Sequence, residues 1–272
     1  ARRLASAAPC KRLQLVGLKR IELCNPVNGY KHAMFDLHEN RSSAIPAEST
    51  KDFAGHCRAT GDMIAAVRST AAAFFAGARG SHDWDHTRRV YRLCDRIASA
   101  ERADLDVVRI AALLHDIGRA LQDTSSGSVC HAQEGARLAG PIVEELALTE
   151  RQKQNILHCI SAHRFRGRQA PETLEARVLF DADKLDAIGA VGVARAFLFA
   201  GEVGARLHNP DVRLEETQPY TADDTGYREY RVKLCKIRDR MLTVAGRQLA
   251  EARHRFMEEY FQRFLQEYDG KE

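Results

Sequence analysis

The chain has 272 residues, of which 44% are hydrophobic and 29% charged, a composition typical of a globular protein with a sizeable core. No run approaches the ~18 consecutive apolar residues that a membrane-spanning helix needs, so no membrane partner is expected. The formal net charge of +4 is too mild to indicate nucleic acid, and no specific nucleic-acid binding is expected. The seven cysteines are scattered and form no CxxC pair, which favours reduced thiols and a cytoplasmic location.

Residues 1–58 differ from the rest of the chain. Six Lys or Arg and no acidic residue occur in ARRLASAAPCKRLQLVGLKR, and turn-forming residues follow in CNPVNGY and ENRSSAIPAEST. We expect a basic N-terminal extension, and three alternatives stay open for it: a hairpin around LQLVGLKRIEL, a disordered segment, or a transit peptide that would direct organellar import. A single helical domain is expected over residues 59–270.

Apolar residues recur at helical spacing from about residue 60 onward, and no alternating run there predicts a strand. The fold class is therefore all-α. Ser81 is the expected N-cap of the second helix. The predicted helices cover 63–80, 82–101, 104–118, 132–147, 149–163, 172–200, 226–241 and 243–268.

The segment 201–226 interrupts this helical pattern. It contains three Gly, two Pro and no helical period. A loop of this length is often functional, so we expect a substrate-side loop or lid; a disordered segment is the alternative.

Three separated segments place polar residues in apolar helices. His86 precedes Val90, and His115 and Asp116 interrupt AALLHDIGRA. Asp181, Asp183 and Asp186 interrupt VLFDADKLDAIGAVGVARAF. A His-Asp pair alone is more often a hydrogen-bonded pair in the core, because burying such groups without partners costs several kcal/mol.

Taken together, the three segments predict a metal site. Two imidazoles and two carboxylates that converge from three helices would hold one divalent metal and leave positions for water. Nitrogen and oxygen ligands together suit Mn, Fe, Co, Ni or Zn better than Mg, which prefers oxygen ligands.

The same residues resemble the HD-domain metal-dependent phosphohydrolase superfamily. HDWDHTRRV at 82–90, LLHDIG at 113–118 and DADKLDAIGAVGVAR at 181–195 match motifs of its bacterial single-domain members. The resemblance covers about residues 60–268. It implies an HD-domain helical bundle, and it implies that the metal ligands are His86, His115, Asp116 and Asp183.

Two further histidines are candidates for the site. HAQEGARLAG, which begins at His131, resembles a helix of two-metal members of the superfamily, and His163 ends the next predicted helix. Each is a candidate ligand of a second metal, a substrate contact, or the acid that protonates the leaving oxygen. A structural role is favoured for His158, and the chain lacks the paired HH and the GYP sequence of cyclic-dinucleotide phosphodiesterases.

Basic residues surround these motifs and are candidates for phosphate binding, although a charge run is usually a solvated face. The candidates are Arg89, Lys184, Arg164 and Arg166. Asp186 is expected to orient substrate, accept a proton, or hydrogen-bond to a ligand. The predicted catalytic residues are Asp116, Lys184, Asp186, His131 and His163.

The expected function is hydrolysis of a nucleotide or related phosphate ester by metal-activated water, with manganese among the candidate metals. Phosphomonoester, phosphodiester and pyrophosphate bonds all remain open. So do a non-catalytic ligand-sensing HD module and a homodimer formed by the C-terminal helices. An HxxxH zinc peptidase is the third functional alternative, but Asp83 stands where that chemistry needs a Glu.

Overall fold

The computed structural model describes residues 19–24, 31–36, 53–76, 83–125, 128–164 and 169–271. The chain divides into two compact units, residues 1–50 and 51–272. In the first unit, β1 (Lys19–Cys24) and β2 (Lys31–Asp36) form an antiparallel hairpin that pairs Lys19 with Asp36. The boundary predicted at residue 58 falls inside the first helix of the second unit, and the role of the extension stays a prediction.

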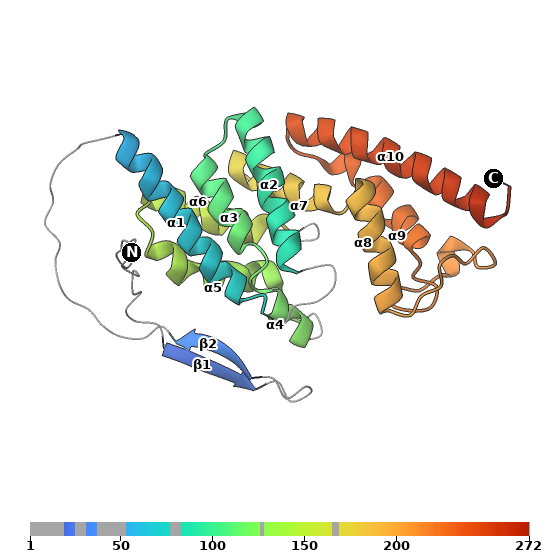
Figure 1. Ribbon diagram of the computed structural model, residues 1–272, viewed down its shortest axis with the longest axis horizontal. Coiled ribbons are helices and arrows are strands. Elements are labelled where there is room, and N and C mark those ends of the chain that lie inside the picture. The colour runs from blue at the N-terminus through green and yellow to red at the C-terminus, as the bar shows by residue number, and fades with distance from the viewer. Residues whose placement is uncertain are drawn as a thin grey trace, which may run out of the picture. The chain divides into compact units, whose positions relative to one another are not determined.

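The second unit is built from helices, which confirms the predicted all-α fold class of this domain (Figure 1). Its helices are α1 Phe53–Ala73, α2 Trp84–Glu101, α3 Leu105–Leu114, α4 Arg119–Thr124, α5 His131–Glu144, α6 Glu150–Ala162, α7 Leu174–Asp186, α8 Gly189–Glu202, α9 Gly226–Val232 and α10 Val244–Tyr268. Short 3-10 turns lie at Leu214–Glu216, Leu234–Lys236 and Arg238–Arg240. None of the helices in the described ranges is both long and apolar enough to cross a bilayer.

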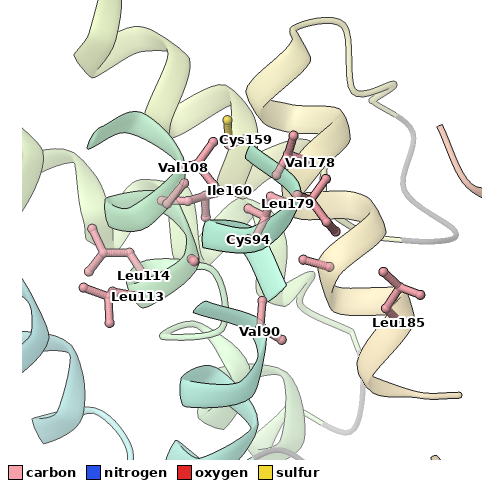
Figure 2. Close-up of a cluster of buried hydrophobic side chains, with 14 of the residues drawn as sticks. Val90, Cys94, Val108, Leu113, Leu114, Cys159, Ile160, Val178, Leu179 and Leu185 are labelled. Carbon is pink, nitrogen blue, oxygen red and sulfur yellow. The ribbon is translucent and has the colours of Figure 1, made fainter. Parts of the chain in front are cut away.

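Helix α3 lies at the centre of the core and contacts α1, α2, α5, α6 and α7. Every residue from Val107 to Leu114 except Arg109 is buried, as expected for a helix that is apolar on nearly all sides. Figure 2 shows its Val108, Leu113 and Leu114 among side chains of the neighbouring helices. The neighbours labelled there are Val90, Cys94, Cys159, Ile160, Val178, Leu179 and Leu185.

Helix α2 begins at Trp84, two residues before His86. Its N-cap is Asp83, whose carboxylate accepts a hydrogen bond from the backbone N–H of His86 at 2.9 Å. The prediction of Ser81 as the cap is therefore wrong: Ser81 lies outside the described residues, and the helix begins at Trp84. The cap fixes the first turn of α2, and His86 lies in that turn.

Two glycines let α5 approach the end of α3 closely. A Cβ atom on Gly118 would lie 2.4 Å from the carbonyl oxygen of His131 and 2.6 Å from the nitrogen of Gly135. A Cβ on Gly135 would lie 3.1 Å from the carbonyl oxygen of His115. Helix α3 therefore ends at Leu114 instead of continuing to residue 118 as predicted, and the chain turns so that α5 begins beside the His-Asp pair.

The helix predicted over 172–200 is two helices. Ile188 is extended (φ −125°, ψ 165°), and Gly189 has φ +77°, a conformation that favours glycine. A side chain on Gly192 would also collide with the backbone of Ala187, because its Cβ would lie 2.2 Å from that carbonyl oxygen. The glycines thus allow α8 to begin at a sharp turn directly after α7.

The helix predicted over 226–241 is also interrupted. Lys233 departs from helical geometry (φ −135°, ψ −56°), so α9 ends at Val232 and two 3-10 turns follow. The segment 201–226 is described throughout and contains the 3-10 turn Leu214–Glu216, and its role as a substrate-side loop stays a prediction. Arg228 anchors it by donating to Thr217 and to Asp224, each at 2.7 Å.

Candidate metal centre

The first cluster of candidate ligands consists of His86, His115 and Asp183. His86 comes from the start of α2, His115 follows the last residue of α3, and Asp183 lies in the last turn of α7. The Nε2 of His86 lies 3.4 Å from both the Nε2 of His115 and an oxygen of Asp183. The three ligand atoms all lie within 4.8 Å of one another.

The second cluster consists of Asp116, His131 and His163. His131 is the first residue of α5, and His163 directly follows the last residue of α6. Their Nε2 atoms lie 3.2 Å apart, and Oδ1 of Asp116 lies 3.5 Å from the first and 3.6 Å from the second. The sequence indicated these histidines as candidates, and the structure brings both of them to Asp116.

The carboxylate of Asp116 lies between the two clusters. While Oδ1 faces the second cluster, Oδ2 lies 3.8 Å from the Nε2 atoms of both His86 and His115 in the first. Asp116 is 3% exposed, so this position is deep in the protein. The four predicted ligands are therefore together, with Asp116 placed to bridge toward a second site.

All four histidines are anchored through Nδ1. The nearest partner of each Nδ1 is an oxygen acceptor, so in the neutral ring Nδ1 carries the proton and Nε2 directs a lone pair into its cluster. The acceptors are Asp186 Oδ2 for His86 (2.7 Å), the Ala112 carbonyl for His115 (2.8 Å), Gln122 Oε1 for His131 (2.7 Å) and the Ile160 carbonyl for His163 (2.6 Å).

This arrangement fits divalent metal ions. Two lone pairs that face each other at 3.4 Å or 3.2 Å repel unless a cation or a proton lies between them. Ligand atoms at about 2.1 Å from one metal lie about 3.0–3.4 Å apart, which agrees with both separations. The donor set combines imidazole nitrogen with carboxylate oxygen, as first-row transition metals prefer.

Burial and neighbouring charges shift the pKa values of these groups in different directions. Burial, aided by His163 and His86, lowers the pKa of His115 to about 4. Burial likewise lowers the pKa of His131 to about 2, with contributions from His163 and Arg119. Burial also opposes protonation of His86, but hydrogen bonds to Asp183 and Asp186 outweigh it and raise the pKa of His86.

Both carboxylates nearest His86 are held in the ionised form. Burial raises the pKa of Asp183, but Lys184 and His86 more than compensate and hold that pKa well below its usual value. For Asp186, hydrogen bonds from His86 and Arg89 likewise outweigh burial and lower its pKa. Metal binding requires ionised carboxylates, and both of these carboxylates are in that form.

The predicted basic residues occupy different places. The ammonium of Lys184 hydrogen-bonds the carboxylate of Asp183 and the carbonyl of His163, the latter at 3.0 Å. Arg89 forms two hydrogen bonds with Asp186, at 2.7 Å and 3.0 Å. Arg164 contacts the sulfur of Cys130 at 3.4 Å, next to His131.

Three other residues considered from the sequence lie away from the clusters or outside the described residues. Arg166 lies outside the described residues, as does His82 of the peptidase alternative. The ring nitrogens of His158 each lie 3.0 Å from a partner, in Gln169 and in the backbone of Glu172, which agrees with the structural role favoured for it.

Three residues near the clusters were not identified from the sequence. Gln122 anchors His131, Arg119 lies 3.8 Å from Oδ2 of Asp116, and Arg195 donates to the side chain and carbonyl of Asp186. Arg195 ends the last matched motif, so its position carried a signal. Gln122 and Arg119 lie on the short helix α4, and only the packing of α4 against α5 reveals their role.

Comparisons with known proteins agree with this geometry. Residues 83–188 match the family model of the HD domain. YpgQ of Bacillus subtilis is 33% identical over 209 residues, which cover 75% of this chain and 93% of YpgQ.

Solved structures show the same fold. An HD-superfamily hydrolase from Bacillus thuringiensis superposes with a TM-score of 0.61 at 28% identity, covering 77% of this chain and 98% of the other. The crystal structure of Bacillus subtilis YpgQ in complex with ADP superposes with a TM-score of 0.57 at 31% identity, covering 77% and 96%. With the HD motif in place among buried histidines and carboxylates, and with these relatives, the chain belongs to the HD-domain phosphohydrolase superfamily.

Proposed function

We propose that the protein is a metal-dependent phosphohydrolase that cleaves a nucleotide at the two neighbouring clusters. The observation that carries this proposal is the common anchoring of four buried histidines through Nδ1, which turns every Nε2 toward a carboxylate cluster. Such an arrangement is costly without a cation, so a structural role alone does not account for it.

In this proposal, one set of residues binds the metal ions and another stabilises charge on the substrate. His86, His115 and Asp183 hold one metal ion, and His131 and His163 hold a second, with Asp116 facing both. When bound, the metals polarise a phosphoryl oxygen and lower the pKa of the attacking water. Lys184 lies beside Asp183 and neutralises charge that builds up on the phosphoryl oxygens.

If His131 and His163 are metal ligands, they cannot also be the acid that protonates the leaving oxygen. Their Nδ1 atoms are occupied by Gln122 and by the Ile160 carbonyl, and their Nε2 atoms face Asp116. A nitrogen that binds a metal has no proton to give. We therefore favour these histidines as metal ligands over the acid role considered from the sequence.

A nucleotide is the proposed substrate. The relative YpgQ has been crystallised with ADP, and YpgQ and this chain share the fold. The proposal does not depend on which phosphate bond is cleaved, because monoester and pyrophosphate bonds present the same phosphoryl oxygens.

The deciding experiment is a release assay over the common nucleoside mono-, di- and triphosphates with Mn, Co, Ni or Mg. Phosphate and pyrophosphate are measured separately, and ¹⁸O-labelled water identifies the atom attacked. One label in the phosphoryl product of a single turnover is expected. Absence of release from every nucleotide with every metal would contradict the proposal and favour a ligand-sensing module.

A further inference from the structure

Asp186 lies next to the first cluster but is not one of its ligands. It is 1% exposed and ends α7. Its Oδ2 accepts from Nδ1 of His86 at 2.7 Å, and Arg195 donates to the same oxygen at 2.7 Å. Arg89 donates to Oδ1 at 2.7 Å and to Oδ2 at 3.0 Å. One buried carboxylate thus joins an imidazole and two guanidinium groups.

The three partners reach Asp186 from two helices. His86 and Arg89 lie three residues apart in α2, so both project from the same face of that helix. Arg195 lies in α8, and it also donates to the backbone carbonyl of Asp186 at 3.1 Å.

The backbone between α7 and α8 makes the return of Arg195 to Asp186 feasible. Gly189 adopts φ +77°, and Gly192 packs against the carbonyl of Ala187 so closely that no Cβ fits there. The turn places α8 immediately after the carboxylate that Arg195 binds. The turn between α7 and α8 therefore brings Arg195 within hydrogen-bond distance of Asp186.

His86 differs in this respect from the other three histidines. Their Nδ1 atoms donate to neutral acceptors, namely two backbone carbonyls and the side-chain amide of Gln122. Only His86 of the four donates to a carboxylate. A carboxylate partner both fixes the ring and makes its other nitrogen a stronger ligand.

We propose that Asp186 is a positioning residue for the first metal and that Arg89 and Arg195 lock its carboxylate in the orientation that aims His86 into the first cluster. The proposal rests on the metal-binding function proposed above. In it, Arg195 holds the carboxylate of Asp186 in place. Arg89 then acts on a metal ligand through Asp186 and is not a direct phosphate contact.

The test measures metal binding by the full chain, with Co²⁺ and Mn²⁺ as probes. Each variant is freed of metal and titrated against a competing chelator, and the visible absorption of bound Co²⁺ reports its ligand geometry. The test variants are Asp186→Asn, Arg195→Met and Arg89→Met. Circular dichroism shows whether each variant is folded.

Two matched controls separate positioning from general stability. Asp181 lies in the same helix and is also buried, but its carboxylate accepts from the backbone of Leu242 and Thr243. Arg253 also donates to the end of α7, at the carbonyl of Leu185. Asp181→Asn and Arg253→Met should lower the thermal stability without changing Co²⁺ affinity or the Co²⁺ spectrum.

We expect Asp186→Asn to weaken one of two binding steps about 10–100-fold, the usual effect of removing such a partner, and to change the Co²⁺ spectrum of that step. Arg195→Met and Arg89→Met should weaken the same step to a smaller extent. Two binding steps within twofold of wild type in Asp186→Asn would overturn this inference and leave the proposed function intact. Failure of the wild type to bind either metal would instead overturn the proposed function.

If Asp186→Asn is unfolded, the double variant with Arg89→Met and Arg195→Met decides the question, because both changes are at partly accessible side chains. One weakened binding step with a changed Co²⁺ spectrum supports the inference, and unchanged binding overturns it.

Discussion

Asp116 belongs to the second cluster and also faces the first. Its two oxygens face different pairs of histidines, at 3.8 Å in the first cluster and at 3.5 Å and 3.6 Å in the second. Under the proposed function, loss of this carboxylate removes a ligand from both sites, whereas loss of any one histidine affects a single site.

For this reason we expect Asp116→Ala to lose metal from both sites and to have no measurable turnover. Elemental analysis of the purified protein checks the metal content. Asp123→Ala is the matched control, because Asp123 is an exposed acid in the neighbouring helix α4. Metal retained at full stoichiometry in Asp116→Ala would show that Asp116 is not a ligand.

Lys184 is the second residue with a separable role. Because it contacts Asp183 without itself offering a lone pair to a cation, Lys184→Met should keep both metals. We expect turnover to fall on the order of 10²-fold, the effect of removing one group that stabilises charge in the transition state. Metal analysis and single-turnover rates on the same sample test this. A loss of metal that matches the loss of rate would assign Lys184 to metal retention instead.

At the scale of the helices, the second cluster depends on how closely α5 approaches the end of α3. Gly118 sets this approach, because any Cβ there would lie 2.4 Å from the carbonyl of His131, the first residue of α5. The same contact places His131 beside Asp116. Packing of α5 and binding of a second metal are therefore linked through one glycine.

Gly118→Ala should lower the free energy of unfolding by about 1–3 kcal/mol, the usual cost of overpacking, and should weaken one metal-binding step more than the other. Urea denaturation and Co²⁺ titration measure the two effects. Gly61→Ala is the control, since no atom lies within 4 Å of its added Cβ and the exchange in helix α1 should stabilise by up to about 1 kcal/mol. Equal stability of Gly118→Ala and wild type would mean that α5 can shift without cost.

For the whole molecule, the buried histidines make stability depend on pH when metal is absent. The folded-state pKa values of His115 and His131 are about 4 and about 2, below the ordinary value of 6.5. The unfolded chain therefore binds more protons than the native protein below pH 6.5, and stability falls as the pH is lowered. The pKa of His86 is raised, so its contribution is present below 6.5 and is lost as the pH rises above it.

We therefore expect the free energy of unfolding of the metal-free protein to be greatest near pH 6.5 and to fall on either side. Each lowered histidine contributes a slope of up to about 1.4 kcal/mol per pH unit on the acid side. Burial raises the pKa of Asp181, and this opposes the trend at the acid end of the range. Urea titrations after chelation measure the profile, and a stability that increases from pH 6.5 to 4.5 would contradict this account.

The features that depend on local order could be predicted from the amino-acid sequence alone. Apolar residues at helical spacing predicted the helices, because a helix that packs on a core must bury one face whatever it packs against. The motifs around His86, His115 and Asp183 identified the superfamily, since their residue types and order are specific. The family model and the relatives confirm both the all-α fold and the superfamily.

How the site is divided into two clusters and supported by its neighbours became visible only from the packing of the helices. His131 meets His163 across 32 residues of chain, and His86 meets Asp186 across 100, so no local spacing encodes either contact. The sequence also did not predict the break between α7 and α8, because it depends on contacts that only the packed structure shows. Gly189 and Gly192 resemble tolerated glycines in an apolar helix until the neighbouring Ala187 and Arg253 show why no side chain fits. Contacts between distant segments form only when the helices pack, and packing is a property of the whole fold.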